Sequence, residues 1–450
     1  MRLLKVLVLV VLVGLAPLAA ASAENYVLSA SNWGAKQASA VQAAGGTIVF
    51  AHGPSGIALV TSSAPDFLQR AQASNAFHGA DADMMVAWQH PVADYAIEEA
   101  VINPTNDTFY PIQWAHAAVE SPAAWAAGCT GDGVRVAVVD GGIFSTHPDL
   151  DANIDVACSA SFVPGQPFNN DVGTFWHGTH VAGIVAAEDN NIGVVGIAPE
   201  ATIMGVKVLH NGSGSFGAVI GGILFSADPA SFGASNCARA DIINMSLGAQ
   251  FFRNQGQGLI SALNKAVNFA ASQGVLVISA AGNSAIDYGQ AGSFIDVPGD
   301  SGSGIAVSAT GPLGWALGAT DYARPASYSN YGEGFVAIAG PGGDAALPGN
   351  APCTKAVVGG SVTVPCWVFD LYLSTSRGTT AAGAYSWAAG TSMATPAASA
   401  VAAIIKQRNP SLSLGALKTE LFRATTDEGK VGNDEFYGHG FVNARKACTE

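Results

Sequence analysis

The chain has 450 residues, of which 49% are hydrophobic and only 12% are charged. This length suits one large domain together with a smaller one. The formal net charge of −14 argues against a phosphate-binding surface, and therefore against a nucleic-acid partner. The 54 glycines indicate tight turns and closely packed elements rather than disorder.

The first 23 residues have the three parts of a secretory signal peptide. Arg2 and Lys5 are basic, residues 6–15 are apolar, and residues 21–23 read Ala-Ser-Ala, which is typical of a cleavage site. A retained membrane anchor is the alternative, but the apolar run is short for a span and Pro17 interrupts it. We therefore expect a secreted or periplasmic protein that has no membrane contact after the signal peptide is removed.

Six cysteines suit an oxidising compartment, and they allow 15 different pairings. None forms a CxxC pair or lies near a histidine at the spacing of a zinc site. Cys353 and Cys366 share one short segment rich in glycine and proline, so they are the pair we expect first.

Residues 24–91 predict a small α+β unit. Strands are expected over 25–30, 47–51, 56–62 and 83–89, and helices over 35–44 and 64–73. This β-α-β-β-α-β order is that of a compact folding unit. Residues 92–108 are acidic, rich in asparagine and without periodicity, which indicates a linker.

From Tyr110 onward, short apolar strands alternate with helices or glycine-rich turns. Strands are expected over 134–140, 201–209, 241–247, 274–283, 304–310 and 335–343. Continuous apolar strands predict an α/β fold in which a parallel sheet is covered on both faces. Ligands of such sheets bind beyond the carboxyl ends of the strands, which is where Asp140, Ser246 and Asn283 fall.

Three polar residues become informative when they are considered together. Taken alone, Asp140 is more simply a turn residue, His177 a helix-end residue and Ser392 a helix cap. Together they supply an acid, an imidazole and a hydroxyl at the mouths of parallel-sheet elements. A serine needs a nearby base to accept its proton, and that base needs a third group to fix its tautomer. Asn283 could offer its side-chain amide to the anion that forms.

The pair His177 and His180 also invites a zinc hypothesis. The HExxH arrangement places its histidines four positions apart with a glutamate between them. Here the spacing is three, without a glutamate or an evident third ligand. We therefore expect no catalytic metal and interpret His180 as a structural residue.

The chain resembles the subtilisin-like serine proteases of the subtilase family over about residues 105–450. The resemblance rests on "VAVVDGGIFSTHPDL" around Asp140, "HGTHVAGIVAA" around His177 and "GTSMATPAASA" around Ser392, in the family's order of Asp, His and Ser. It implies a three-layer parallel-sheet domain over 109–450 and a secreted serine endopeptidase of proteins or peptides. Asp140 would orient His177, His177 would be the general base, Ser392 the nucleophile and Asn283 an oxyanion donor.

The resemblance also implies how substrate and inhibitor bind. Ser246, Leu247 and Gly248 match one edge segment for an extended substrate, and Ser213 and Gly214 match the other. Residues 24–91 resemble the family's propeptide, an intramolecular inhibitor that is cut away within the linker 92–108. An unrelated N-terminal binding domain is the alternative.

Structural calcium is a further implication of the resemblance. The loop over 186–196 has the length of the family's calcium loop, and hard oxygen ligands suit Ca²⁺. The implied ligands are Asp107, Asp149, Glu188, Asn190, Ile192 and Val194. Glu188 and Asp189 have a simpler interpretation as solvated loop charges.

One departure from the family pattern bears on specificity. The stretch "SFIDVPGDSGSGIAVSAT" is hard to align with the floor of the specificity pocket, and Asp296 there would favour basic residues before the cut. Two rival functions remain at this stage. One is an acyltransferase that uses the same triad, and the other is a catalytically silent binding protein with the same fold.

Overall fold

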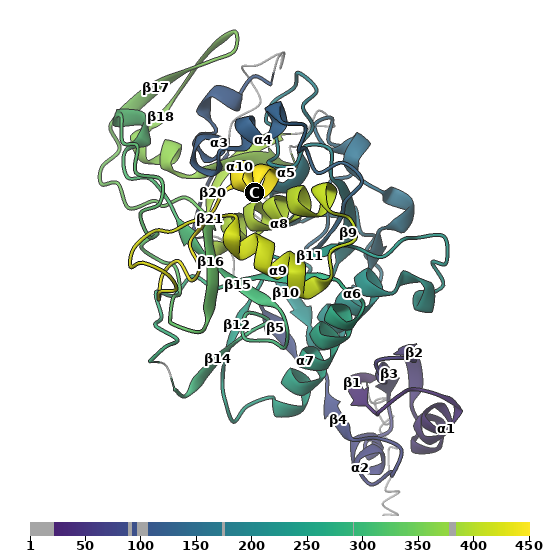
Figure 1. Ribbon diagram of the computed structural model, residues 1–450. Helices are drawn as coiled ribbons and strands as arrows, with labels where there is room; N and C mark the ends of the chain where they lie inside the picture. The colour runs from purple at the N-terminus through teal and green to yellow at the C-terminus, as the bar shows by residue number, and fades with distance from the viewer. Residues whose placement is uncertain (1–21, 89–91, 97–106, 173–175, 291, 378–383) are drawn as a thin grey trace, which may run out of the picture.

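The computed structural model describes residues 22–88, 92–96, 107–172, 176–290, 292–377 and 384–450 (Figure 1). The predicted signal segment lies outside the described residues except for its last two positions. Within the described ranges, none of the helices combines the length and the apolar character needed to cross a bilayer.

The N-terminal unit is a four-stranded antiparallel sheet with two helices, and Figure 1 shows it beside α6 and α7. Leu28, Val60 and Phe67 are fully buried in its own core. Five of its six predicted elements are confirmed. In sheet order the strands are β2 (Thr47–His52), β3 (Ile57–Ser62), β1 (Glu24–Ser29) and β4 (Gly79–Ala82), and the helices are α1 (Ala35–Ala44) and α2 (Phe67–Gln72).

The expected last strand over 83–89 was wrong as a member of this sheet. The fourth place is taken by β4, whose sequence Gly-Ala-Asp-Ala carries almost no apolar signal. The apolar run after it forms β5 (Met85–Ala87), which pairs with β10 (Ser213–Ser215) of the large domain. Part of this run packs at an interface between the two units: Trp88 is 1% exposed, and its ring centroid lies 5.7 Å from that of Phe216, whereas Met85 is 66% exposed.

The large domain is built on a nine-stranded sheet, parallel except for the β21–β22 pair at one edge. Five of the six predicted strands lie at its centre and the sixth, β9, lies next to β7. In sheet order the strands are β21 (Thr425–Thr426), β22 (Phe441–Val442), β16 (Val336–Pro341), β15 (Ile305–Thr310), β13 (Leu276–Ala280), β11 (Ile242–Met245), β7 (Arg135–Asp140), β9 (Thr202–Lys207) and β8 (Ala160–Ser161).

Helices cover both faces of this sheet, as the continuous apolar strands predict. Along β7, Val136 and Val138 enter one core, while Ala137 and Val139 enter the other. The first core holds α5 (His177–Ala186), α8 (Thr391–Arg408), α9 (Leu414–Arg423) and α10 (Ala444–Thr449), and the second holds α6 (Phe216–Ala227) and α7 (Gln257–Ser272). The result is the predicted three-layer α/β domain.

Smaller elements decorate this frame. Three strand groups are β12 (Ala249–Phe252) with β14 (Phe294–Val297), β17 (Pro352–Val357) with β18 (Gly360–Pro365), and β19 (Tyr372–Ser376), β20 (Ala384–Ala389) and β6 (Ala93–Ala96). Two short helices are α3 (Trp114–Val119) and α4 (Ser121–Ala126). Short 3-10 turns span Tyr110–Ile112, Asp151–Asn153, Val156–Cys158, Pro229–Phe232, Trp315–Leu317 and Cys366–Asp370.

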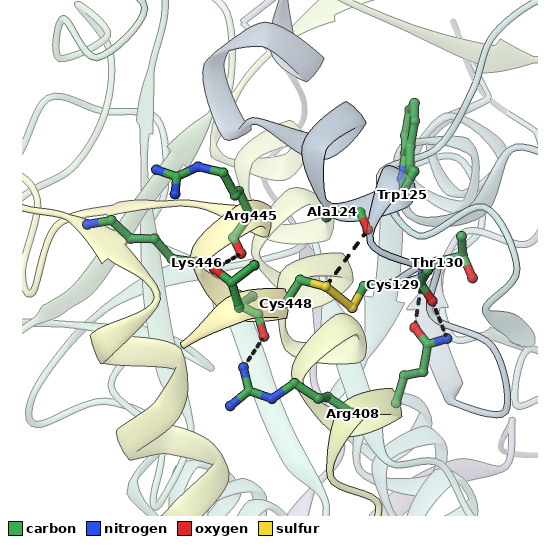
Figure 2. Close-up of a disulfide and its surroundings, with 12 residues drawn as sticks. Ala124, Trp125, Cys129, Thr130, Arg408, Arg445, Lys446 and Cys448 are labelled. Carbon is green, nitrogen blue, oxygen red and sulfur yellow. Dashed lines mark hydrogen bonds between the residues drawn. A yellow bond between two sulfur atoms is a disulfide. The ribbon is translucent and has the colours of Figure 1, made fainter.

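All six cysteines form disulfides, as export predicts. The expected pair Cys353–Cys366 is confirmed and closes the base of the β17–β18 hairpin. The other pairs are Cys158–Cys237 and Cys129–Cys448. The last of these joins positions 319 residues apart and fastens α10 beside α4 (Figure 2).

Candidate active site

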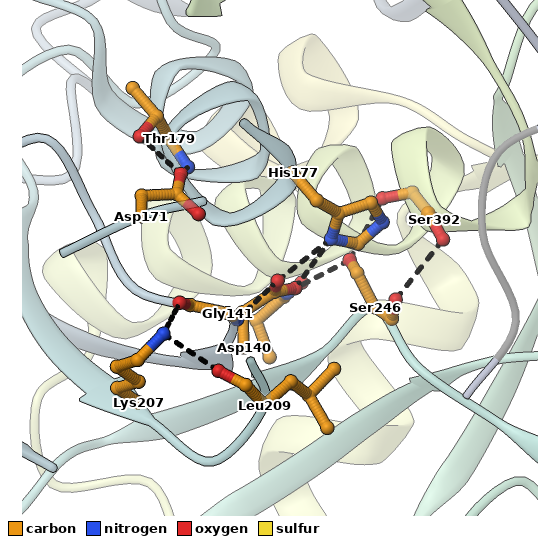
Figure 3. Close-up of polar contacts among 10 residues, drawn as sticks. Asp140, Gly141, Asp171, His177, Thr179, Lys207, Leu209, Ser246 and Ser392 are labelled. Atoms are coloured by element: carbon orange, nitrogen blue, oxygen red, sulfur yellow. Dashed lines mark hydrogen bonds and ion pairs between the residues drawn. The ribbon is translucent and has the colours of Figure 1, made fainter. Parts of the chain in front are cut away.

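The end of one strand and the starts of two helices meet at one place and bring Asp140, His177 and Ser392 together (Figure 3). Asp140 is the last residue of β7, His177 is the first residue of α5, and Ser392 is the second residue of α8. Glycine permits this close approach: a Cβ on Gly178 would stand 2.0 Å from the Gly142 carbonyl oxygen. The start of α5 therefore packs directly against the turn that follows Asp140.

Asp140 holds the imidazole ring of His177 in one orientation. His177 Nδ1 lies 2.8 Å from both carboxylate oxygens of Asp140, which is 1% exposed. Burial disfavours the charged imidazolium, but the Asp140 charge and hydrogen bond outweigh burial, and the pKa of His177 is raised. With Nδ1 directed at Asp140, Nε2 is the nitrogen that can accept a proton on the other side, and Figure 3 shows the ring beside Ser392.

Ser392 lies at the N-terminus of α8 and is tied to Ser246. The Ser392 hydroxyl donates to the Ser246 carbonyl at 3.1 Å, and the Ser246 hydroxyl donates to the Ser392 carbonyl at 2.8 Å. The position at the start of an 18-residue helix directs backbone N–H groups toward the space beside the Ser392 hydroxyl. An anion that forms there is stabilised by the helix end.

Asn283 lies after β13, next to the start of α8. Its side-chain oxygen accepts hydrogen bonds from the Thr391 backbone N–H at 2.9 Å and from the Thr391 hydroxyl at 2.8 Å. With the oxygen held by Thr391, the NH₂ group is the end that points elsewhere. The structure therefore brings the predicted oxyanion donor to the residue that immediately precedes Ser392.

The sequence analysis did not predict two buried residues behind the site, Asp171 and Lys207. The Asp171 carboxylate accepts from the Thr179 N–H at 2.8 Å and from the Thr179 hydroxyl at 2.5 Å, and burial raises its pKa to about 7. The Lys207 ammonium donates to the Gly141 carbonyl and, at 2.7 Å, to the Leu209 carbonyl. A lysine inside the apolar stretch "ATIMGVKVL" was a usable signal, because a fully buried lysine needs partners.

His180 is a buried structural residue on α5. Its Nε2–H donates to the Ser386 carbonyl at 2.9 Å, and burial lowers its pKa to about 3, so the ring stays neutral. In the described ranges, no group of three or more His, Cys, Asp or Glu side chains is arranged to hold a metal.

The two predicted substrate segments have different surroundings. Ser246, Leu247 and Gly248 follow β11 directly, and Ser246 contacts Ser392. Ser213 and Gly214 belong to β10, whose edge is paired with β5: Ser213 faces Ala87 and Gly214 faces Val86.

The predicted calcium ligands gather around one loop. Asp149 Oδ2 accepts from the Val194 N–H at 3.0 Å, and Asn190 Oδ1 accepts from the Ile192 N–H at 2.9 Å. The carboxylate of Glu188 accepts from the Ala152 N–H at 2.9 Å, so Glu188 caps a neighbouring turn.

Two carboxylates of this cluster have an atom that no donor satisfies. Asp107 Oδ1 and Asp149 Oδ1 are buried without a hydrogen-bond partner. Burial, followed by the charge of Asp189, raises the pKa of Asp107 to about 6. Asp189 was not among the predicted ligands, yet it is the acid that acts most strongly on Asp107.

Comparison with known proteins decides the family. The model of the Subtilase family matches residues 131–440, which is more than half of the chain. The chain belongs to the subtilase family. The predicted subtilisin-like fold and the prediction of a serine endopeptidase are both confirmed by this membership.

Named relatives are similar over most of this subtilase. M-protease of Shouchella clausii (strain KSM-K16) is 37% identical over 359 residues, covering 79% of this chain and 74% of that protein. Subtilisin Savinase of Lederbergia lenta is 37% identical over 338 residues, covering 75% of this chain and 98% of that protein. The solved epidermin leader peptide processing serine protease of Staphylococcus aureus has a TM-score of 0.72 at 20% identity, covering 95% of this chain and 98% of that one, and so shares the fold.

Proposed function

We propose that this subtilase cleaves peptide bonds with Ser392 as nucleophile, His177 as general base and then acid, and Asp140 as the group that orients the imidazole. The observation that carries this proposal is the 2.8 Å contact of both Asp140 oxygens with His177 Nδ1. A base held in one tautomer beside a serine at a helix N-terminus is the arrangement that acyl transfer requires.

The reaction then runs in two halves. His177 Nε2 takes the Ser392 proton as the hydroxyl oxygen bonds to the substrate carbonyl carbon, and the carbonyl oxygen becomes an anion. The Asn283 amide and the Ser392 N–H stabilise that anion. His177 gives the proton to the leaving amine, which leaves an acyl-enzyme, and water activated by the same imidazole releases the acid.

The pH dependence of kcat/KM tests the role of His177. The base must be neutral to accept a proton, and its pKa is raised above the ordinary 6.5 by Asp140 and, less strongly, by Asp171. Activity should therefore fall below an apparent pKa higher than 6.5. Asp171, whose pKa is about 7, is charged over the upper part of this pH range, so Asp171→Asn should move the acid limb of the pH profile to lower pH, with kcat/KM at pH 9 changed by less than about tenfold.

Asp155→Asn is the matched control, because Asp155 pairs with Arg135 at 2.7 Å, outside this site. Its acid limb should coincide with that of the wild type. If the acid side of the kcat/KM profile has the same apparent pKa in Asp171→Asn as in the wild type, Asp171 has no influence on the proton affinity of His177.

We also propose that residues 24–91 are a propeptide that blocks the site and is removed after export of the precursor through the signal peptide 1–23. The β5–β10 pairing supports this, because it adds a strand to the segment that the resemblance gives to substrate. The Trp88 indole N–H donates to the Gly214 carbonyl at 3.2 Å, and Asp83 Oδ1 accepts from the Gly217 N–H at the start of α6 at 2.9 Å.

The chain beyond β5 supports the same conclusion. The Val92 N–H donates to the Ala389 carbonyl at 2.7 Å, and β6 then runs antiparallel to β20, the strand that leads to Ser392. The described segment before residues 89–91 is thus paired with β10, and the one after them is paired with the strand that leads to Ser392. A permanent binding domain would not need to occupy the substrate edge.

Intact mass of the purified protein tests this proposal. The secreted wild type should lose the mass of residues 24 to at least 88, and the position of its new N-terminus locates the maturation cut. The Ser392→Ala precursor should keep these residues, because no acyl-enzyme can form. Full-length mass in both proteins would instead favour the permanent domain.

A structural calcium ion is the third part of the proposal. The orphaned oxygens of Asp107 and Asp149 are hard anionic ligands in a buried cluster, and that donor set fits Ca²⁺. Asn190 and the carbonyls of Ile192 and Val194 complete the implied set, while Asp189 acts on this set through its charge, which raises the pKa of Asp107. Bound calcium would neutralise the mutual repulsion of the acids and fix the loop. It takes no part in the proposed proton transfers.

Removing calcium should therefore destabilise the protein. A ligand present at 100 times its Kd contributes about 2.7 kcal/mol, which corresponds to roughly 5 °C in Tm. We expect EDTA to lower the Tm of the Ser392→Ala protein by about this amount and added Ca²⁺ to restore it. Asp149→Asn should have a low Tm that EDTA does not lower further. If EDTA does not change the Tm of the Ser392→Ala protein, the calcium proposal is contradicted.

A further inference from the structure

Asp296 is a buried carboxylate that no cation among the described residues pairs with. It lies on β14 and is 0% exposed, and the Tyr288 hydroxyl is the one side-chain donor that acts on it among the described residues. None of the ion pairs among the described residues includes it. A buried acid without a cation costs several kcal/mol unless something binds to it.

The position of Asp296 links it to the catalytic serine. Asp296 Oδ1 lies 3.0 Å from the point where a Cβ on Gly248 would stand, so the carboxylate packs directly against Gly248 and a side chain at this position would crowd it. Gly248 ends the segment that begins with Ser246, which exchanges two hydrogen bonds with Ser392. The Ala280 carbonyl lies 3.8 Å from the same point, on the strand that leads to Asn283.

The strand pairing fixes this relation. Gly248 leads directly into β12, and Gln250 of β12 pairs with Asp296 of β14. The two strands therefore hold the acid behind the segment that touches the nucleophile.

No cation among the described residues neutralises this acid. The neighbours that act on it are Asp300 and the Tyr288 hydroxyl, and burial followed by the Asp300 charge raises the pKa of Asp296. Asp300 accepts from the Asp296 N–H at 3.1 Å, and Arg253 acts on Asp300 rather than on Asp296. The site is therefore short of positive charge and of hydrogen-bond donors.

We propose that Asp296 is the floor of the pocket for the substrate side chain that precedes the cleaved bond, and that it selects lysine or arginine there. This inference rests on the proposed role of Ser392. An ammonium or guanidinium group supplies both the charge and the donors that Asp296 lacks. An aliphatic or aromatic side chain would cover the carboxylate without satisfying it, and an acidic one would add repulsion.

The preference applies to substrates in trans. Residues 83–108 contain no Lys or Arg, so self-maturation has to cut after a residue that is not preferred. An intramolecular cut tolerates this because the effective concentration of a tethered segment is very high. Propeptide removal is then a slow single event, whereas turnover of foreign substrates depends on Asp296.

The test compares matured enzymes on peptides that differ only in the residue before the cut: Lys, Arg, Leu, Phe or Glu. The wild type should show kcat/KM for Lys and Arg about tenfold or more above Leu and Phe, with Glu lowest. Asp296→Asn should lose about tenfold or more on Lys and Arg, with Leu and Phe changed by less than about threefold. Asp155→Asn is the matched control, because Asp155 pairs with Arg135 and does not contact Asp296, and its Lys-to-Leu ratio should stay within about threefold of the wild type.

Each outcome separates this inference from the function on which it rests. A wild type that cleaves peptides but favours Leu or Phe overturns the pocket assignment alone, as does an Asp296→Asn variant with an unchanged Lys-to-Leu ratio. A matured wild type that cleaves none of the peptides overturns the function and the inference together. If Asp296→Asn proves inactive on every peptide, Asp296→Ser is measured instead. The wild-type ratio of kcat/KM for Lys over Leu then still tests the pocket assignment.

Discussion

Ser392→Ala should lower kcat/KM for peptide hydrolysis by roughly 10⁶-fold, the magnitude known for removal of the nucleophile from subtilisin. Ser392 is the hydroxyl that lies beside His177, the base that Asp140 holds in place. The Ser246 hydroxyl cannot substitute, because it donates to the Ser392 carbonyl. The residual rate after the substitution should come from substrate binding and from stabilisation of the oxyanion.

The measurement needs a variant matured in trans by a tagged wild type that is then removed. Covalent labelling guards against carry-over: a serine-directed phosphonate should add its mass to the wild type and not to Ser392→Ala. Ser399→Ala is the control, since Ser399 is a buried serine of the same helix that donates to Asn244 at 2.9 Å. Its kcat/KM should stay within about tenfold. Labelling of the Ser392→Ala protein would show that another residue is the nucleophile.

Asn283→Ala should lower kcat by about 10²–10³-fold with little change in KM, the loss known for the oxyanion asparagine of subtilisin. The amide acts on charge that exists only in the transition state, so substrate binding does not depend on it. We expect the variant to fold, because Asn283 is only half-buried and lies beyond the end of β13.

Asn283 has a second role that the experiment must separate from the first. Its oxygen also holds Thr391, so the alanine variant loses that anchor as well. Thr391→Val removes the hydroxyl contact and keeps the Asn283 amide, and it should cost less than about tenfold in kcat. Equal losses in the two variants would mean that Asn283 acts by positioning α8 instead of by stabilising the anion.

Much of the catalytic domain could be predicted because its strands are buried on both faces. Residues 135–140 and 276–280 are continuous apolar runs, and such runs have few alternatives to a central parallel strand. The convergence of Asp140, His177 and Ser392 followed from their places at element ends. The family motifs then fixed the order of these residues along the chain.

The features that were missed depend on contacts between distant segments. β4 has no apolar pattern of its own, and it forms because β1 offers an edge. Asp171 and Asp189 are ordinary loop acids in the sequence, and only folding buries the first and brings the second to Asp107. Asp296 could be named from the sequence, but its burial without a cation depends on the strands that surround it.

The disulfide between Cys129 and Cys448 turns most of the catalytic domain into a covalent ring. Every loop between these two positions lies inside the ring, including the β17–β18 hairpin. One cut by a neighbouring copy of the enzyme opens the ring but releases no fragment, so the nicked chain keeps its pieces in register and can hold its fold. Release of a fragment from this ring therefore requires a second cut.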